Sequence, residues 1–497
     1  MRAIMPNPSR PRRLAAAVCA TATLYGCTVG PDFHTPPAPA VSTYTPAPQP
    51  TATSASTGPG GAAQRFVGAE SIDSSWWQAF GSNALNRLVL QALDDSPTLA
   101  QARMKLAEAQ QDYLAQADAT QRPQLDAKLS ATREQVDPTA FGITNAKQPG
   151  PFTLYNASVS VSYALDLFGA NRRALEALAA QVDYQQYEFD AARLSLAGNV
   201  VTTALRRASL ARQIALTEAI LDAQTRQLEI TERRTTLGGV SRVDLLSQST
   251  QMQQTRASLP PLRKQLAQAD HQLAVYLGRA PAELGVDADA RGNTGALDLD
   301  ALTLPTELPL TLPSTLARQR PDIRASEALL HQAGANIGVA TANLYPQITL
   351  SGSAGTQRTS VSDLLKGINV WSLGAGLTQP LFHGGQLRAK KRAAEAAYEA
   401  ALASYRQTVV QGLQEVADAM RALQHDADEL QSRDEADRAT RESAEIASRR
   451  YASGGISQLA LLDTQRQELQ TRLDRVKVQA QRYADTAALY QALGARP

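Results

Sequence analysis

The sequence predicts a mixed α/β membrane protein built from a duplicated unit of helix, strand, strand, long helix and helix. The duplication is visible in residues 229–256, which align without gaps on residues 445–472 with 13 of 28 positions identical. An alternation of apolar and polar residues at 154–167 indicates a strand, and uninterrupted helical patterns at 170–236 and 384–452 indicate long helices. A fixed repeat offset is typical of a repeated architecture, and period two over a dozen residues is typical of a β-strand.

Composition and charge argue against a nucleic-acid-binding protein. The chain has 497 residues, of which 43% are hydrophobic and only 5% aromatic, and its formal net charge is +2. Few aromatic residues favour closely packed long helices over a wide core. Lysine and arginine do not gather into the basic surface that nucleic-acid binding requires, so we expect no nucleic-acid partner.

The sequence contains no recognisable catalytic or metal-binding motif. Its two cysteines, Cys19 and Cys27, lie in the first 27 residues, and its five histidines lie far apart, so no set of metal ligands stands out. The GxSxG pattern of a serine nucleophile is missing as well. We therefore expect no catalytic residue, no metal and no cofactor, and a protein that is not an enzyme.

Residues 1–26 are predicted to be a secretory signal peptide. A basic start precedes an apolar run at 14–26, which is too short to cross a membrane as a helix. The junction Leu24-Tyr25-Gly26-Cys27 resembles the bacterial lipobox, so we expect cleavage before Cys27 and lipidation of that residue. The alternative is an ordinary signal with an incidental cysteine. Thr28 follows where lipoproteins of the inner membrane usually carry Asp, which implies the outer membrane.

Residues 27–70 are predicted to be a lipidated, Pro-rich tether. Eight prolines lie between Pro31 and Pro59, and a segment of this composition is extended and buries little apolar surface. The aromatic cluster Trp76-Trp77-Gln78-Ala79-Phe80 follows, and we expect it to pack in a core rather than to bind a ligand.

The first repeat is predicted to span 71–278 and the second 314–497, with a linker at 279–313. Each repeat begins with a helix, at about 84–120 and 314–343. Two short matches support the same order of elements, because Leu167-Phe168-Gly169 matches Leu381-Phe382-His383 and Pro123-Gln124 matches Pro346-Gln347.

Two membrane-spanning strands are predicted in each repeat, at 123–136 and 152–168 and at 346–358 and 369–382. In the second strand, apolar residues such as Val159 and Val161 share one face, and Ser158 and Ser160 share the other. The lengths suit tilted membrane strands of roughly 9–11 residues. The alternative is a half-exposed sheet of a soluble protein.

A hairpin of two long helices is predicted to end each repeat, at 170–278 and 384–493. The turns fall at Gly238-Gly239 and Gly454-Gly455, because glycine ends helices in the left-handed conformation. Pro260-Pro261 predicts a bend or a break in the first hairpin. The C-terminal helix carries apolar residues at alternating spacings of three and four, the seam of a coiled coil, with Arg466 as the polar exception.

Four membrane strands cannot close a barrel, and open edges are not tolerated in lipid. Because the smallest closed barrels need about eight strands, at least two chains must share one barrel. The polar strand faces would then line its lumen.

The sequence resembles the outer-membrane efflux protein family, the outer-membrane factors of tripartite efflux pumps, and specifically its lipoprotein branch. The resemblance covers nearly the whole mature chain and rests on motifs in a fixed order. They are Cys27-Thr-Val-Gly-Pro-Asp-Phe33, Trp76-Trp77-Gln78-Ala79-Phe80, Leu312-Pro-Ser-x-Leu316, Arg320-Pro-Asp-Ile-Arg324-Ala-Ser-Glu327, Ile337-Gly-Val-Ala340 before Tyr345-Pro346, and Gln379-Pro-Leu-Phe382 before Gly384-Gly385. Of these, Arg320-Pro321-Asp322 is predicted to start a helix and pack rather than to form a functional site.

The resemblance implies a homotrimer with a 12-strand transmembrane β-barrel, continued by a long α-helical coiled-coil barrel. A mixed belt surrounds the middle of that tunnel, and the 279–313 linker belongs to it. The implied partners are outer membrane lipid, a periplasmic adaptor (membrane fusion) protein and an inner-membrane efflux pump. The implied location is the outer membrane of a Gram-negative bacterium, with the helices extending into the periplasm.

The family gate lies near the periplasmic helical tips. The candidate gate residues are Glu445, Arg449, Arg450 and Tyr451. The alternative is that these charges simply solvate a helix face.

The two turns are the candidate sites for adaptor docking. The residues are Thr236, Leu237, Gly238, Gly239, Val240, Ser453, Gly454, Gly455 and Ile456. A solvent-exposed turn has little use for apolar side chains, so we expect Leu237, Val240 and Ile456 to meet the adaptor. The alternative is that they staple their own hairpins.

These features predict a passive exit duct for substrates that an inner-membrane pump and its adaptor deliver. The alternative is a structural coiled-coil lipoprotein of the envelope without a pore, against which the alternating strands argue. An enzyme with an unrecognised site has no motif in its support.

Overall fold

The computed structural model describes residues 28–46, 51–137, 142, 150–283 and 297–495. The predicted signal peptide and Cys27 lie outside these residues. The chain divides into two compact units, each made of three stretches. The strand unit comprises Met1–Thr35, Leu106–Gln185 and Ser326–Tyr405, and the helical unit comprises Pro36–Lys105, Gln186–Ala325 and Arg406–Pro497.

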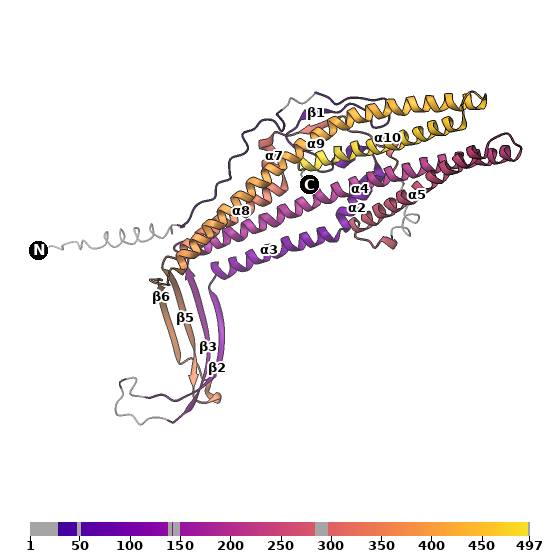
Figure 1. Ribbon diagram of the computed structural model, residues 1–497. Coiled ribbons are helices and arrows are strands. Elements are labelled where there is room, and N and C mark those ends of the chain that lie inside the picture. Colours follow the sequence, from indigo (N-terminus) through magenta and orange to yellow (C-terminus); the bar gives the residue numbers. More distant parts are fainter. Residues whose placement is uncertain (1–27, 47–50, 138–141, 143–149, 284–296, 496–497) are drawn as a thin grey trace. The chain divides into compact units, whose positions relative to one another are not determined.

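The strand unit holds a four-stranded antiparallel sheet in the order β2-β3-β5-β6 (Figure 1). The strands are β2 (Gln124–Glu134), β3 (Phe152–Leu165), β5 (Gln347–Arg358) and β6 (Val370–Thr378). Each lies within one of the four ranges predicted from alternation, and the mixed α/β class is confirmed. The central pair joins the two halves of the chain, because β3 belongs to the first half and β5 to the second.

The register aligns apolar residues across the sheet. Val161 of β3 lies opposite Leu125 of β2 and Gly352 of β5, and Gly352 in turn lies opposite Leu373 of β6. One residue along, Ser160 lies opposite Ser353. Because successive side chains point to opposite faces, this register separates an apolar face from a polar face.

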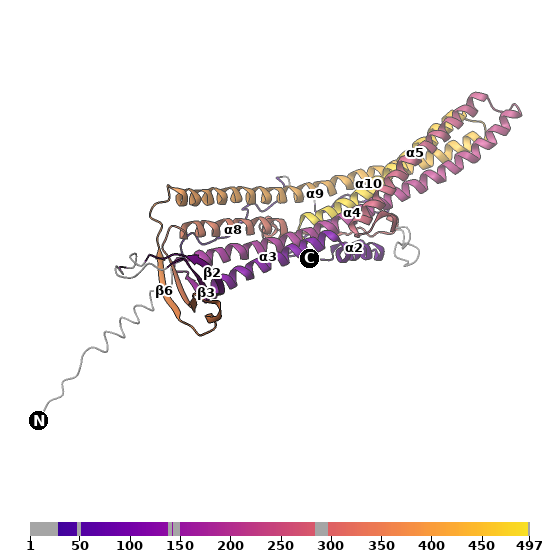
Figure 2. The same ribbon diagram turned by 90° about the horizontal axis from the view of Figure 1, so that it is seen from below.

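Two pairs of long helices dominate the rest of the chain (Figures 1 and 2). Helices α4 (Ala170–Thr236) and α9 (Gln386–Ala452) each have 67 residues, and α5 (Arg242–Tyr276) and α10 (Gln458–Ala492) each have 35. The shorter helices are α2 (Asn83–Asp95), α3 (Pro97–Gln121), α7 (Pro313–Gln319) and α8 (Pro321–Ala342). Among the described residues, no helix is long and apolar enough to cross a membrane.

Helix α5 passes through Pro260 and Pro261 without ending, so a break at this point is wrong. Both prolines are exposed, where water can hydrogen-bond the carbonyls that lose their helical partners.

The backbone of the second half repeats that of the first at a constant offset in residue number. Three pairs of glycines show it, because both members of each pair have positive φ at the same structural position. The pairs are Gly169 with Gly385, Gly238 with Gly454, and Gly278 with Gly494. The numbers within each pair differ by 216, and we call this difference the repeat offset.

The repeat offset corrects one of the short sequence matches. Leu167-Phe168 and Leu381-Phe382 differ in number by 214 instead, so they do not occupy equivalent backbone positions. The second half has two more residues between this pair and the following helix. Gly384 and Gly385, which precede α9, both adopt left-handed conformations, with φ of 55° and 84°.

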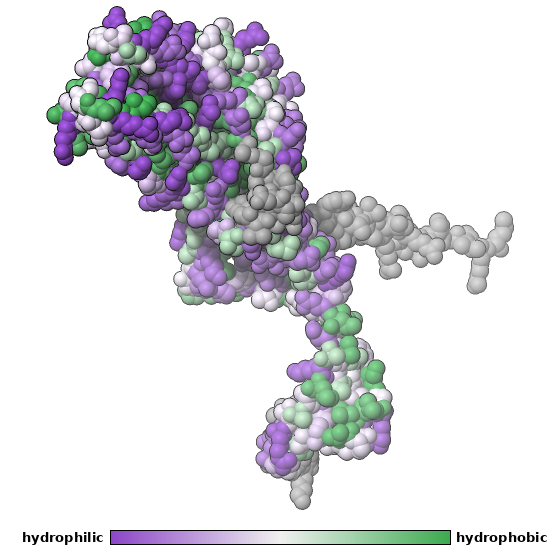
Figure 3. Space-filling model, turned by 90° about the vertical axis from the view of Figure 1, so that its right-hand side faces the viewer, coloured by the Kyte–Doolittle hydropathy of each residue, from purple (hydrophilic) through white to green (hydrophobic). Residues whose placement is uncertain are grey.

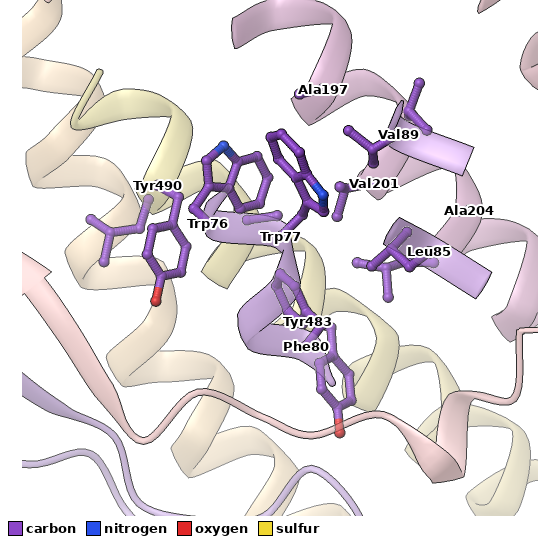
Figure 4. Packing of buried hydrophobic residues seen from close by; sticks show 14 of the residues in the cluster. Trp76, Trp77, Phe80, Leu85, Val89, Ala197, Val201, Ala204, Tyr483 and Tyr490 are labelled. Carbon is purple, nitrogen blue, oxygen red and sulfur yellow. The ribbon is translucent and has the colours of Figure 1, made fainter. Parts of the chain in front are cut away.

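The core of the helical unit forms around the predicted aromatic cluster (Figure 4). Trp76, in the 3-10 helix η1 (Trp76–Phe80), stacks on Tyr490 of α10 with ring centroids 5.4 Å apart. The rings of Phe80 and Tyr483 have centroids 6.1 Å apart. The hydroxyl of Tyr483 donates to the carbonyl of Leu302 at 2.8 Å. Leu85 of α2 is fully buried beside them. The prediction that the aromatic cluster packs in a core is confirmed.

The predicted tether is docked along part of its length rather than free. Strand β1 (Arg65–Gly68) pairs in parallel with β4 (Glu307–Leu310). The buried guanidinium of Arg482 donates to the carbonyls of Gly60 and Ala62 at 2.9 and 2.8 Å. Composition predicted an extended segment that buries little apolar surface, and backbone carbonyls make these attachments.

Residues 28–35 are likewise attached within the strand unit. Arg173 of α4 donates to the carbonyl of Val29 at 3.3 Å and to the carboxylate of Asp32 at 2.7 Å. The ring of Phe33 stacks on His331 of α8 with centroids 4.3 Å apart. The segment directly after Cys27 is therefore held in place.

Candidate functional site

The apolar face of the sheet is open. Leu129 is 76% exposed, Leu373 82% and Trp371 78%, and hydrophobic side chains gather over the strands in Figure 3. Contiguous exposed apolar surface of this kind marks a membrane or an interaction site.

The opposite face of the sheet is polar, and serines line the middle of its two central strands. Ser160 lies opposite Asp126 on one side and Ser353 on the other. The hydroxyls of Ser353 and Ser372 are hydrogen-bonded at 2.8 Å. With apolar residues on one face and polar residues on the other, the sheet suits two different media, lipid and water.

The two helical turns have the same backbone. In the first, the amide of Gly239 donates to the carbonyl of Arg234 at 2.8 Å, and in the second Gly455 donates to Arg450 at 2.8 Å. The hydroxyls of Ser241 and Ser457 then accept the amides of Asp244 and Ala460 and cap the following helices. Gly238 and Gly454 both have positive φ, at 78° and 75°, so the left-handed glycine predicted at the end of each helix is confirmed in both turns.

The apolar residues of the turns differ in exposure. Leu237 is 86% exposed, whereas Val240 and Ile456 are half-buried. Sequence reasoning missed Val243 and Leu459, which lie in the first turns of α5 and α10 at positions related by the repeat and are 72% and 58% exposed. Their regular place in a helical pattern gave no reason to expect exposure.

The candidate gate residues fall into two groups. Glu445, Arg449 and Arg450 are exposed on α9. Tyr451 is half-buried, and its hydroxyl donates to Oε1 of Gln458 at 3.1 Å.

A buried polar network lies below the turns and was not predicted. Gln458 of α10 donates to the Oε1 atom of Gln248 of α5, which also accepts the hydroxyl of Thr231 of α4 at 2.8 Å. Together with Tyr451 of α9, these residues connect all four long helices. The available signal was Gln248 itself, a polar residue at an apolar seam position between Leu245 and Met252.

Arg320 is a packing device, as predicted. Its buried guanidinium donates to Asp322 at 2.8 Å, to Glu415, and to the carbonyl of Ala492 at 2.8 Å. Burial alone would lower the pKa of Arg320, but the hydrogen bonds and charges of Asp322 and Glu415 outweigh it and raise the pKa. The guanidinium therefore stays charged and ties α8, α9 and the end of α10 together.

Comparison with known proteins gives consistent relatives over nearly the full length. Outer membrane protein OprJ of Pseudomonas aeruginosa is 29% identical over 486 residues, covering 96% of this chain and 95% of that protein. Nodulation protein T of Rhizobium leguminosarum bv. viciae is 30% identical over 455 residues, covering 92% of this chain and 87% of that protein.

Solved structures agree with these relatives. The outer-membrane channel OprN superposes with a TM-score of 0.80 at 29% identity, covering 94% of this chain and 99% of that one. The open state of the Neisseria gonorrhoeae MtrE outer membrane channel gives 0.78 at 26% identity, with 94% and 98% covered. The sequence profile described as outer membrane efflux protein matches residues 88–279 and 312–495. The chain therefore belongs to the outer membrane efflux protein family, whose members act as efflux channels in the outer membrane of Gram-negative bacteria.

Proposed function

We propose that the chain forms the exit duct of a tripartite efflux system and passes substrates across the outer membrane passively, without catalysis. The observation that carries this proposal is the sheet with one apolar and one polar exposed face, whose two edges pair with no other strand among the described residues. An open-edged sheet is unstable in lipid, but a closed ring of such sheets encloses a polar lumen.

Three copies form the ring. Three chains with four strands each give a 12-strand barrel, above the minimum of about eight strands for a closed membrane barrel. The four long helices of each chain, α4, α5, α9 and α10, then form a 12-helix tunnel, with the 279–313 linker in a belt around it.

The partners are a periplasmic adaptor and an inner-membrane pump. Relatives from Pseudomonas putida are named as the outer membrane proteins of a toluene efflux pump and of an antibiotic efflux pump, each 28% identical over 474 residues. Another is named for pyoverdine export. Names that differ in cargo on one scaffold suit a duct that takes its specificity from the pump.

Conductance of purified protein in planar lipid bilayers tests the duct. We expect stable single-channel currents, whereas a structural coiled-coil lipoprotein without a pore gives none. Sealed bilayers despite correctly inserted protein would remove the proposal.

The adaptor docks on the apolar residues of the two turns, of which Leu237 is exposed and Val240 and Ile456 are half-buried. Leu237→Asp, and Val240→Asp combined with Ile456→Asp, should abolish adaptor cross-linking and efflux while trimer yield and conductance remain normal. Leu90→Asp on α2 is a matched control, because Leu90 is also exposed, at 45%, but lies away from the turns in sequence. If the double variant lowers trimer yield instead, Val240 and Ile456 staple their own hairpins.

The gate is formed by the exposed charges Glu445, Arg449 and Arg450, with Tyr451 held by Gln458. Glu445→Ala and Arg449→Ala should raise the conductance of the isolated duct. Unchanged conductance in both variants means that these charges only solvate the helix.

Cys27 carries lipid and anchors the mature chain. Mass spectrometry of the mature N-terminus should find Cys27 as the first residue, with acyl chains attached. The Cys27→Ser variant should carry no acyl chain. Cleavage elsewhere or an unmodified cysteine excludes the anchor.

A further inference from the structure

The edges of the sheet, strands β2 and β6, lack partners within the part of the chain that the structure describes. Each therefore presents a row of unpaired backbone amides and carbonyls, and an unsatisfied backbone group in hydrocarbon costs several kcal/mol. Leucines on these strands are among the most exposed of the molecule, with Leu129 at 76% and Leu377 at 66%. Both edges need another strand beside them.

The internal repeat relates the strands of the two halves position by position. Helices α4 and α9 begin at Ala170 and Gln386, which differ by the repeat offset. The glycines before them, Gly169 and Gly385, differ by the same offset and have similar φ of 80° and 84°. Strand β3, which precedes α4, therefore corresponds to β6, which precedes α9, and the repeat offset relates their residue numbers.

The pairing of β2 with β3 and of β5 with β6 gives the difference in residue number between β2 and β5. Gln124 of β2 lies opposite Ser162 of β3, and Gln347 of β5 lies opposite Thr378 of β6. Ser162 and Thr378 differ by the repeat offset, so Gln124 and Gln347 correspond, with a shift of 223 in residue number (347 − 124). The match of Pro123 with Pro346 has the same shift and was found independently from sequence.

We propose that β6 of one copy pairs antiparallel with β2 of the next copy, in the register of the central β3·β5 ladder. Within one chain, Val161 lies opposite Gly352 and Ser160 lies opposite Ser353. Applying the two shifts places Leu377 opposite Leu129 and Gly376 opposite Ser130 across the interface between copies. This register rests on the proposed ring of copies and specifies which residues lie opposite each other where two copies meet.

The chemistry of the two faces agrees with this register. Leu377 and Ala375 meet Leu129 and Ala131 on the apolar face. On the polar face, Gly376 meets Ser130 and Thr378 meets Lys128. A slip by one residue would place apolar against polar residues along the whole seam and is excluded. A slip by two keeps the faces and places Leu377 opposite Ala127 or Ala131. The match of Leu167-Phe168 with Leu381-Phe382 would give a slip by four, with Leu377 opposite Leu125.

Cysteine cross-linking in the full-length protein distinguishes these registers. The predicted pairs are Leu377→Cys with Leu129→Cys, and Gly376→Cys with Ser130→Cys. Two consecutive pairs are needed because opposed residues alternate between hydrogen-bonded and closer, non-hydrogen-bonded positions. The matched slip variants combine Leu377→Cys with Ala127→Cys or with Ala131→Cys, and single-cysteine variants are controls for the Cys27 that every variant retains.

The expected distances separate the outcomes. Directly opposed residues have Cα atoms about 4.5–5.5 Å apart, which a disulfide can join, whereas diagonal neighbours lie at roughly 7–8 Å, beyond its usual reach. We expect mild oxidation of outer membranes to give reducible covalent trimers from at least one predicted pair, and at least tenfold less from both slip variants.

Two failures can be told apart by measuring the mass of the uncrosslinked complex in detergent. Trimers that cross-link only through Ala127 or Ala131, or through no pair, overturn the register and leave the ring intact. A monomer without any cross-link overturns the proposed ring itself.

Discussion

Helices α5 and α10 occupy the same place in the two halves of the chain, yet they are buried to very different extents. Both have 35 residues, both are capped by a serine, and both are followed by a glycine with positive φ, Gly278 or Gly494. Helix α10 nevertheless buries twice as many side chains as α5. The difference is concentrated near the C-terminal end, where Tyr483 and Tyr490 take the positions of Ala267 and Ala274.

The comparison separates two kinds of information in the sequence. A capping hydroxyl or a left-handed glycine acts on neighbouring backbone groups, so both halves retain the same turns and helix ends. A large buried side chain needs a partner elsewhere in the fold. The partners of α10 are Trp76 and Phe80, which belong to a segment before the first repeat's strands.

The largest difference between the halves should appear on shortening Tyr483. Tyr483→Ala removes a fully buried ring from the core and its hydrogen bond to Leu302, so we expect a loss of about 3–5 kcal/mol in the free energy of unfolding. Ala267→Ser, at the equivalent and exposed position of α5, should change it by less than about 0.5 kcal/mol. Urea unfolding in detergent, followed by near-UV circular dichroism, measures both. Equal effects would mean that the two positions contribute equally to the free energy of unfolding.

The strands provide a case in which the two halves should behave alike. Val161→Arg places a charge on the apolar face and should destabilise the inserted protein by about 2–4 kcal/mol more than Ser160→Arg, if the site lies near the bilayer midplane. The repeat predicts the same inequality for Leu377→Arg and Gly376→Arg. Folding yield into lipid vesicles across a urea series compares the four variants. Equal tolerance within either pair would reverse the assignment of its faces.

The corners before α3 and α8 contrast a small residue with a large one. Ser96 and Arg320 both end a short helix and precede the proline that begins the next, and both are buried. Arg320→Leu removes charge-assisted hydrogen bonds to Asp322, Glu415 and the end of α10, so we expect a loss of about 2–3 kcal/mol. Ser96→Ala should cost less than about 1 kcal/mol. Thermal unfolding of both variants in detergent shows whether Arg320 contributes more to the free energy of unfolding than Ser96.

Local and long-range features differed in how far the sequence could predict them. The four strands, the long helices and the glycine turns follow from period-two or helical patterns and from glycine at helix ends, all of which act over a few residues. Arg482 was not predicted, because the carbonyls of Gly60 and Ala62 lie near the other end of the chain. The pairing of Gln248 with Gln458 escaped for the same reason, since it depends on how two hairpins pack.

The candidate site divides in the same way. The two faces of the sheet were predicted because alternation states them directly. The exposure of Val243 and Leu459 was not, because a regular apolar position in a helix gives no information on whether a neighbour covers it. The half-buried Tyr451 likewise needed the position of Gln458 to be understood.

The two helical turns should respond equally to substitution of their left-handed glycines. Gly238→Val and Gly454→Val force a β-branched residue to positive φ, which costs about 1–2 kcal/mol, although a Cβ would meet nothing within 4 Å. Gly239→Ala and Gly455→Ala are matched controls, because these glycines do not have positive φ. Amide hydrogen exchange of the turns measures the local strain, and faster exchange should appear only in the valine variants. Faster exchange in one turn alone would break the equivalence of the tips.

The smallest difference should be one that depends on pH. Asp426 of α9 is half-buried near Asp485 of α10, and burial, the hydrogen bond to Asp485 and the nearby negative charges of Asp485 and Glu429 raise its pKa to about 8, while Arg482 opposes them. The equivalent positions of the first half, at the same repeat offset, hold the buried apolar pair Leu210 and Ala269.

The sign of the pH effect follows from proton binding. Between pH 4 and 8 the folded protein holds a proton, shared by Asp426 and Asp485, that the unfolded chain has released, so stability falls as pH rises through this range. Asp426→Leu restores the apolar character of the first half and should flatten this slope, with its stabilising effect greatest near pH 9. Because the carboxyl group is only half-buried, solvent screens it and the change should be smaller than for the glycine variants. Thermal unfolding of wild type and variant at pH 5, 7 and 9 tests the slope, with Asp428→Leu, on an exposed position of the same helix, as the control. A wild-type stability that rises from pH 5 to pH 9 by an amount that Asp426→Leu removes would mean that Asp426 is charged in the folded protein, and the contrast with Leu210 would lose its electrostatic basis.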